Sequence, residues 1–190
     1  MTHAGPAAMA AVLAGALSMP PLRSVIEQSM AWHMVFQMPL LVAAGALAAR
    51  ALSAPRLPGQ WINFNLFGLT GFMAAQSIIA YWMLPSAIDR AVVNPLFDVL
   101  KLLTLFVSGM LLRDAFQRAP RALQLFFIGY WVSMMCWLGI YFATTDLRLC
   151  NAYSRESQTV TGWGLLALGL LLGIVWLGNV WQETVKHPSA

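Results

Sequence analysis

Five side chains near the start of the first long apolar segment combine types and spacing that suit a soft metal ion. They are Met30, His33, Met34, Gln37 and Met38. Their i, i+3, i+4, i+7, i+8 spacing places all five on one face of a helix. Thioether and imidazole groups are good ligands for copper, particularly Cu(I), whereas Mg²⁺ and Ca²⁺ prefer oxygen ligands. The stripe therefore predicts a copper site formed by His33 with Met30, Met34 and Met38.

Two other interpretations of this stripe stay open. Methionine is a flexible packing residue, so a methionine stripe at helical spacing is also typical of a core. The imidazole of His33 favours a function, because ionisable groups inside membranes are costly. Haem is the second alternative, with His33 and Met73 or Met134 as axial ligands. His33 is the one histidine within an apolar segment, since His3 and His187 lie near the ends of the sequence, and no Cys-x-x-Cys-His motif for covalent haem attachment occurs.

A second pair of candidate residues, Asp98 and Lys101, lies in another apolar segment. Their i, i+3 spacing places both on one side of a helix, where they can form an ion pair. Lys101 is expected near the midpoint of the segment, where an unpaired charge costs ~2.5–3.5 kcal/mol on insertion scales. The pair predicts either a structural contact that fixes helix rotation, or a proton or ion relay, or an anchor for a partner subunit.

The elements that position these residues follow from the composition. The chain has 190 residues, of which 59% are hydrophobic and only 9% charged, and its mean hydropathy is +0.69. A soluble domain carries roughly 25% charged residues. The composition excludes a soluble enzyme, a disordered tail and a nucleic-acid-binding module, and the net charge of +4 is scattered through loops. It predicts a polytopic membrane protein without enzymatic activity and without a nucleic-acid partner.

Five segments are long and apolar enough to cross a hydrocarbon core, which takes ~20 residues in a helix. No alternation typical of barrel strands occurs, so the expected fold is all-α, a single transmembrane helix bundle over residues 1–190. An apolar run at 6–19 is shorter and predicts a helix packed on the bundle, with a sixth span as the alternative. The expected spans are 26–49, 62–84, 92–112, 123–145 and 159–181.

The distribution of arginine and lysine predicts the orientation of these spans. With the start of the first span outside, the inner loops receive more basic residues than the outer loops. This places the C-terminus in the cytoplasm. The inner residues are Arg50, Arg56, Arg113, Arg118, Arg121 and Lys186, and the outer residues are Arg23, Arg90, Arg148 and Arg155.

The two cysteines are not expected to form a disulfide. Cys136 lies within the fourth span and Cys150 in the following loop, separated by ~20 Å of mostly helical chain, whereas a disulfide needs Cα atoms within ~7 Å. Cys150 is expected to be exposed on the outer side. In the last span, Gly169 and Gly173 form a small-x-x-x-small pattern that permits close helix contact, within the chain or with a partner.

Several motifs resemble those of CtaG-type cytochrome c oxidase assembly proteins of bacterial inner membranes. The run from His33 through Met34 and Gln37 to Pro39 and Leu40 is similar to the His-Met-x-x-Gln pattern of that group. Further similarity lies in Leu84-Pro85-Ser86-Ala87-Ile88-Asp89, in Asp98 with Lys101, and in Leu147-Arg148-Leu149-Cys150-Asn151-Ala152-Tyr153. The chain is smaller than typical members and has Gln37 where a second ligand is expected. The resemblance implies copper handling for a haem-copper oxidase.

The leading hypothesis is therefore a bacterial inner-membrane protein that assembles or supports a copper-dependent respiratory complex. An accessory subunit without its own metal is the alternative, with its glycine-rich last span and Asp98 and Lys101 facing other membrane subunits. A haem-binding electron carrier is a third possibility.

Overall fold

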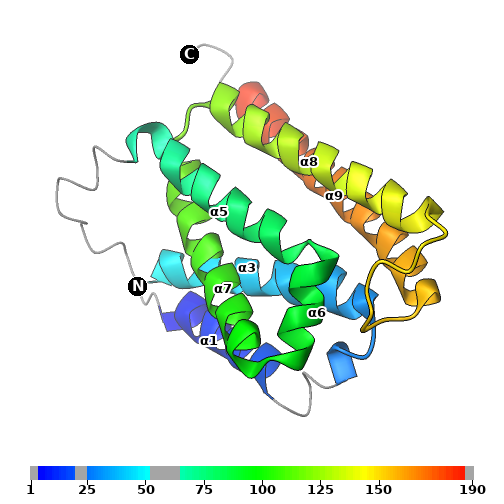
Figure 1. Cartoon of the computed structure of the whole chain (residues 1–190). Helices are drawn as coiled ribbons and strands as arrows, with labels where there is room; N and C mark the ends of the chain where they lie inside the picture. The colour runs from blue at the N-terminus through cyan, green and yellow to red at the C-terminus, as the bar shows by residue number, and fades with distance from the viewer. Residues whose placement is uncertain (1–3, 20–24, 52–64, 187–190) are drawn as a thin grey trace.

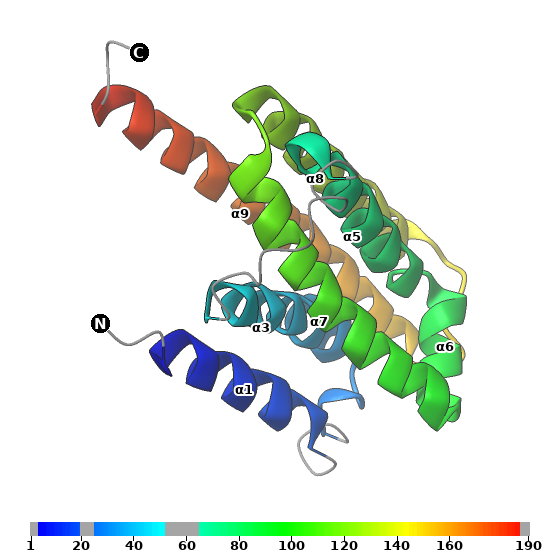
Figure 2. The ribbon, with the colours of Figure 1, turned by 90° about the vertical axis from the view of Figure 1, so that its left-hand side faces the viewer.

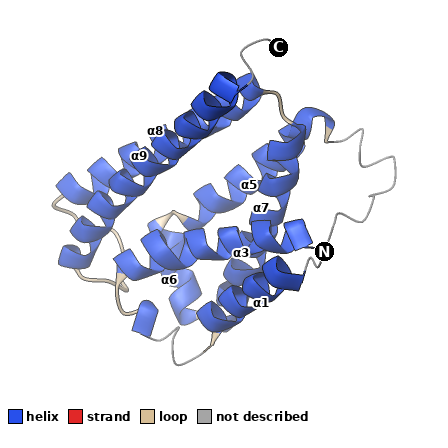
Figure 3. Cartoon of the chain, turned by 180° about the vertical axis from the view of Figure 1, so that it is seen from behind, coloured by secondary structure: helices blue, strands red, loops and turns tan. Residues whose placement is uncertain are grey.

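The computed structural model describes residues 4–19, 25–51 and 65–186, and within these ranges every regular element is a helix (Figure 3). The elements are α1 (Ala4–Ser18), the π-helix η1 (Trp32–Gln37), α3 (Met38–Ala51), the 3-10 helix η2 (Leu66–Gly68), α5 (Leu69–Trp82), α6 (Pro85–Val93), α7 (Pro95–Arg118), α8 (Arg121–Thr144) and α9 (Arg155–Lys186). This confirms the predicted all-α fold.

Among the described residues, four helical segments are long and apolar enough to cross a membrane: Trp32–Arg50, Pro95–Arg118, Arg121–Thr144 and Arg155–Glu183. A fifth span is formed if the bent pair Leu66–Trp82 and Pro85–Val93 is counted as one. The chain is therefore a multi-pass membrane protein.

The helices form two groups that meet near η1 (Figures 1 and 2). In the first group α1 packs on α3, α3 crosses α7, and α5 packs along α7. The second group is the α8–α9 hairpin, whose helices lie against each other and touch the first group through η1. Phe72 of α5 also stacks on Phe127 of α8, with ring centroids 4.4 Å apart. The candidate site lies where the two groups meet.

The crossing of α3 and α7 depends on two glycines. A Cβ atom at Gly45 would lie 1.9 Å from the carbonyl oxygen of Phe106, and one at Gly109 would lie 1.9 Å from that of Val42. Only hydrogen fits at these two positions. The two backbones are therefore in direct contact, which sets the distance between the residues that each helix carries to the site.

Prolines mark the starts of two helices, one after the predicted second span and one within the predicted third span. Pro85 and Pro95 are each the first residue of a helix, a position where the missing N–H costs nothing. The segment at Pro85 bends the chain by 72° and starts the short helix α6. The predicted third span, 92–112, is wrong at both ends because α6 extends to Val93 and α7 to Arg118.

The first span also starts later than predicted. Residues 27–29 form a turn, and the segment able to cross the membrane begins at Trp32 instead of residue 26. The predicted fourth span agrees with α8, and the fifth is contained in the longer α9. The predicted N-terminal helix is confirmed as α1, packed on α3. Residues 62–64 of the second predicted span, His3, Arg23, Arg56 and His187 lie outside the described residues.

Candidate functional site

All five residues of the predicted stripe are buried. Met30, His33, Met34 and Gln37 have no exposed surface, and Met38 is 3% exposed. The helix face that they were predicted to share is the buried one.

Three residues of the stripe, His33, Met34 and Gln37, lie in the π-helix η1, a feature that was not predicted from the sequence. In η1 the backbone N–H of Met38 donates to the carbonyl of His33, five residues earlier. Pro39 follows directly; it has no N–H for the carbonyl of Val35, and in a regular α-helix its ring would clash with that carbonyl. The wide turn accommodates this proline. Single π-turns of this kind occur frequently at functional sites.

Asp98 and Lys101 form the predicted ion pair on α7, with 2.9 Å between Lys101 Nζ and Asp98 Oδ1. Both residues are fully buried. The sequence predicted Lys101 near the middle of the span, and this prediction is wrong. Since α7 runs from Pro95 to Arg118, the pair lies in its first two turns.

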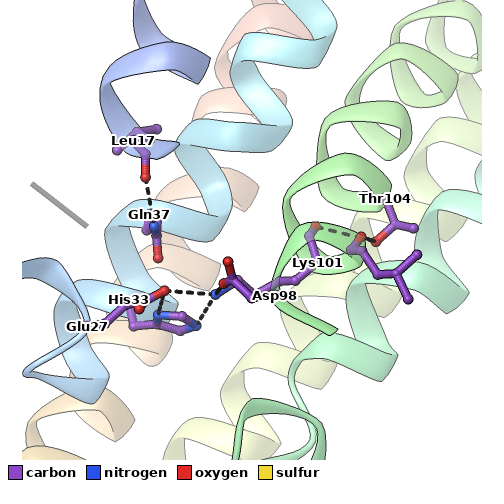
Figure 4. A network of polar contacts seen from close by, with 8 residues as sticks. Leu17, Glu27, His33, Gln37, Asp98, Lys101 and Thr104 are labelled. Atoms are coloured by element: carbon purple, nitrogen blue, oxygen red, sulfur yellow. Dashed lines mark hydrogen bonds and ion pairs between the residues drawn. The ribbon is translucent and has the colours of Figure 1, made fainter. Parts of the chain in front are cut away.

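His33 of the stripe and the ion pair of Asp98 and Lys101, which were predicted separately, form a single cluster (Figure 4). Lys101 Nζ lies 3.4 Å from His33 Nε2 and 3.1 Å from Oε1 of Glu27. The same Glu27 oxygen is 3.9 Å from His33 Nδ1. Two carboxylates, one ammonium and one imidazole therefore meet between the start of η1 and the start of α7.

Glu27 is the member of the cluster that sequence reasoning missed. A continuous helix from residue 26, as predicted, would place Glu27 at its outer end. In the structure the turn at 27–29 places its carboxylate beside His33 and Lys101. The signal that could have identified it is an acidic residue one or two turns before a buried histidine.

The hydrogen-bond roles within the cluster follow from the groups themselves. An ammonium has only donors, so Lys101 donates and His33 Nε2 accepts. The ring proton is then on Nδ1, the nitrogen that faces Glu27. The lone pair of His33 that would bind a metal therefore points at Lys101.

Neighbouring elements fix the cluster in place. Gln37 Nε2 donates to the carbonyl of Leu17, which ties η1 to the last turn of α1. The backbone N–H of Met30 donates to Ser157 Oγ at 2.8 Å, which ties the start of the first span to α9. Gln37 is thus a link to α1.

The loop 145–154 between α8 and α9 lies over the same end of the bundle. The ring of Tyr153 is 6.3 Å from that of His33, measured between centroids. Arg148 donates to the carbonyls of Cys150, Asn151 and Tyr153, which gives the loop its shape. Asp89 of α6 accepts from the backbone N–H of Asn151 and of Ala152. The loop is therefore anchored to α6 as well as to itself.

Cys150 of this loop is buried, being 1% exposed, so the prediction of an exposed thiol is wrong. Burial, and to a smaller extent the charge of Asp89, raises the pKa of the Cys150 thiol to about 12. Burial likewise raises the pKa of Tyr153, with smaller effects of Glu27, Cys150 and Asp89. Cys136 and Cys150 are both free thiols, as predicted.

Met38 differs from the other methionines of the stripe. It lines an apolar cavity of about 250 Å³ between the two helix groups, together with Met83, Trp131 and Met135, whereas Met30, His33 and Met34 do not line that cavity. Of the three stripe methionines, only Met38 therefore contributes to the wall of this cavity.

The glycines of the last span contact α8 within the chain. A Cβ at Gly169 would lie 3.0 Å from that of Met135, and one at Gly173 would lie 3.3 Å from the side chain of Val132. Gly162 and Gly139 face each other in the same way. The close helix contact that the sequence left open thus occurs in the hairpin itself.

Comparison with protein families, curated proteins and solved structures gives no match to this chain. The resemblance to CtaG-type proteins therefore rests on the sequence motifs alone.

Proposed function

We propose that the chain is a non-enzymatic membrane protein that assembles or supports a copper-dependent respiratory complex, and that it holds Cu(I) at His33. The proposed setting is a bacterial inner membrane, with the C-terminus in the cytoplasm and the cluster toward the periplasm. The observation that carries the proposal is the complete burial of His33 and Met34 in η1 and of Met30 about one turn before them. Imidazole and thioether donors of this kind suit Cu(I).

The donor set fits copper, with one condition. Within the described part of the chain no three His, Cys, Asp or Glu side chains are grouped as a metal site, so the thioethers must contribute. The condition is that Nε2 of His33 becomes free, because it accepts a hydrogen bond from Lys101 at 3.4 Å. Copper and the ammonium cannot use the same lone pair.

The alternative, an accessory subunit without a metal, has less support from the geometry. It relies on Asp98 and Lys101 and on the glycines of the last span as surfaces for a partner. Asp98 and Lys101 have no exposed surface, and Gly169 and Gly173 contact α8. The ion pair and these two glycines therefore make contacts within this chain rather than offering a surface to a partner. Comigration with a large complex on a native gel would favour this alternative.

Copper content measured by elemental analysis on detergent-purified protein tests the proposal. We expect close to stoichiometric copper in the wild type and loss of copper in His33→Ala. Met34→Leu and Met30→Leu remove a thioether while conserving volume, so they should lower the copper content without unfolding the chain. Met73→Leu is the matched control, because Met73 is 54% exposed on α5.

An absorption spectrum of the same samples separates the remaining outcomes. Copper that persists in His33→Ala, or an absence of copper in the wild type, contradicts the proposed site. A Soret band that is lost in His33→Ala would instead establish the haem alternative, with Met73 or Met134 as candidate partners.

A further inference from the structure

A polar pocket of about 470 Å³ lies at the end of the bundle where α7 ends, α8 begins and α9 ends (Figure 2). Its volume is within the roughly 300–1,000 Å³ that is typical of small-molecule sites. The three helices contain candidate membrane spans, of which the first ends at Arg118, the second begins at Arg121 and the third ends at Glu183. The pocket therefore lies at one edge of the membrane region, where lipid head groups meet the protein.

The wall of this pocket is held by a hydrogen-bond network around Gln124, which is buried. Its Nε2 donates to the carbonyls of Phe116 and Ala119, which ties the start of α8 to the end of α7. Its Oε1 accepts from Arg121 at 3.0 Å and from the indole N–H of Trp176 at 3.5 Å, which ties α8 to α9. One buried side chain thus links the three helices that enclose the pocket.

Arg113 brings to this pocket a positive charge that the described part of the chain does not neutralise. Its side chain is half-buried, its Nε is covered, and within the described residues it forms neither a hydrogen bond nor an ion pair. Arg121, by contrast, is paired with Glu183, and Arg118 is paired with Asp114. A guanidinium is always protonated, and a charge that is partly removed from water is costly without a partner. An anion bound in the pocket would remove this cost.

The phosphate group of a membrane lipid has the chemistry that this pocket can recognise. A guanidinium binds phosphate oxygens through parallel N–H···O bonds. The exposed carboxamides of Gln117, Asn179 and Gln182 line the pocket and offer further donors. The rings of Phe116 and Trp176 also line it and suit the apolar part of a lipid. Basic pockets between membrane helices bind phospholipid head groups in this way.

We propose that this pocket binds the phosphate of an anionic phospholipid such as phosphatidylglycerol, with Arg113 as the principal contact. The inference is independent of the proposed copper function, because Arg113 lies near the end of α7 whereas Asp98 and Lys101 lie near its start. In the orientation proposed above, the lipid belongs to the cytoplasmic leaflet. A bound lipid would link α9 to α7 at this end of the bundle.

Native mass spectrometry of the full chain, purified in detergent and titrated with phosphatidylglycerol, tests the site. Arg113→Gln should weaken binding about fivefold or more, because it removes the unpaired charge that the phosphate contacts. Arg118→Gln is the matched control, because it removes the same charge from the same helix although Arg118 does not line the pocket. This control should bind the lipid as the wild type does.

Two further ligands identify what the pocket recognises. Phosphatidylcholine has the same phosphodiester without a net charge, so it should bind more weakly than phosphatidylglycerol. Inorganic phosphate in excess should not displace the lipid, because it lacks the apolar part that the aromatic rings contact. Asn179→Ala is a second pocket variant in case Arg113→Gln does not fold, since Asn179 is exposed. It removes one amide donor and should also weaken the binding of phosphatidylglycerol.

The results that would overturn the lipid site are distinct. Unchanged binding in Arg113→Gln and in Asn179→Ala shows that the pocket does not hold the lipid. An equal loss in Arg113→Gln and Arg118→Gln shows that the lipid responds only to the general surface charge. Equal affinity for phosphatidylcholine shows that the charge of the head group is not recognised. Displacement by inorganic phosphate assigns the pocket to a free anion instead of a lipid.

Discussion

The contact between α3 and α7 makes a strong prediction about Gly109. In the substitution Gly109→Ala, the new Cβ would lie 1.9 Å from the carbonyl oxygen of Val42 and 2.9 Å from the backbone nitrogen of Ala46. Contacts of Cβ atoms below 3.0 Å essentially never occur. The carbonyl must therefore retreat by at least about 1.1 Å, and the atoms in the way belong to the backbone of a helix, which cannot turn aside as a side chain does.

The magnitude follows from two opposing effects. Overpacking of this kind costs typically about 1–3 kcal/mol, while replacing glycine by alanine inside a helix contributes up to about 1 kcal/mol of stability. Gly129→Ala in α8 is the matched control, because its added Cβ meets nothing within 4 Å. The helix contribution is common to both variants and cancels, so they should differ in stability by roughly 1–3 kcal/mol, with Gly109→Ala the less stable.

Thermal unfolding in detergent measures this difference. At roughly 2–4 °C per kcal/mol for a chain of this size, Gly109→Ala should unfold roughly 2–12 °C below Gly129→Ala. The same separation of α3 from α7 should loosen the contact between Lys101 and His33. Equal unfolding temperatures for the two variants would refute the direct backbone contact and, with it, the crossing that positions the site.

The remaining predictions concern the charge cluster and the loop over it. Asp98→Asn should lower the free energy of unfolding, measured by thermal unfolding, by up to about 3–5 kcal/mol, because it removes one partner of a buried ion pair. Glu27→Gln should lower it less, because the side chain of Glu27 is 14% exposed whereas that of Asp98 is 1% exposed. Cys150, measured in a Cys136→Ser background, should react with a maleimide at pH 8 far more slowly than after unfolding, since the raised pKa and burial leave little accessible thiolate; equal rates would contradict this. Asp89→Asn should accelerate that labelling, because it weakens the anchoring of the loop and removes the charge that opposes thiolate formation; an unchanged rate would show that the loop is held without Asp89.

Part of the candidate site could be predicted because it depends on helical periodicity alone. The inward stripe of Met30, His33, Met34, Gln37 and Met38 follows from residue spacing, and so does the pairing of Asp98 with Lys101. The all-α fold could be predicted from the length and apolarity of the segments, because long apolar segments without strand alternation cross a membrane as helices.

The meeting of these two constellations could not be predicted. It depends on the crossing of α3 and α7 at Gly45 and Gly109, which is a property of tertiary packing, and no spacing rule relates residue 33 to residue 101. The role of Glu27 was missed because the turn at 27–29 interrupts what the hydropathy presents as one helix. The depth of Lys101 was misjudged because the predicted span covers residues 92–112, whereas α7 runs from Pro95 to Arg118.

The burial of Cys150 could not be predicted for a similar reason. A short polar loop is expected to be exposed, but Arg148 organises this one through three carbonyls, and Asp89, distant in sequence, holds it against α6. Only the folded arrangement shows that the thiol is covered.

The order in which the cluster is completed during biosynthesis follows from its position in the sequence. His33 belongs to the first membrane span and Glu27 to the turn before it, and Lys101, which contacts both, comes 68 residues after the histidine. At a synthesis rate of about 5–20 residues per second, Lys101 is made about 3–14 s later. During that interval the imidazole of His33 and the carboxylate of Glu27 have no contact with the ammonium of Lys101. Insertion of α7 then completes the cluster, so a chain arrested before Pro95 would contain His33 and Glu27 without Asp98 and Lys101.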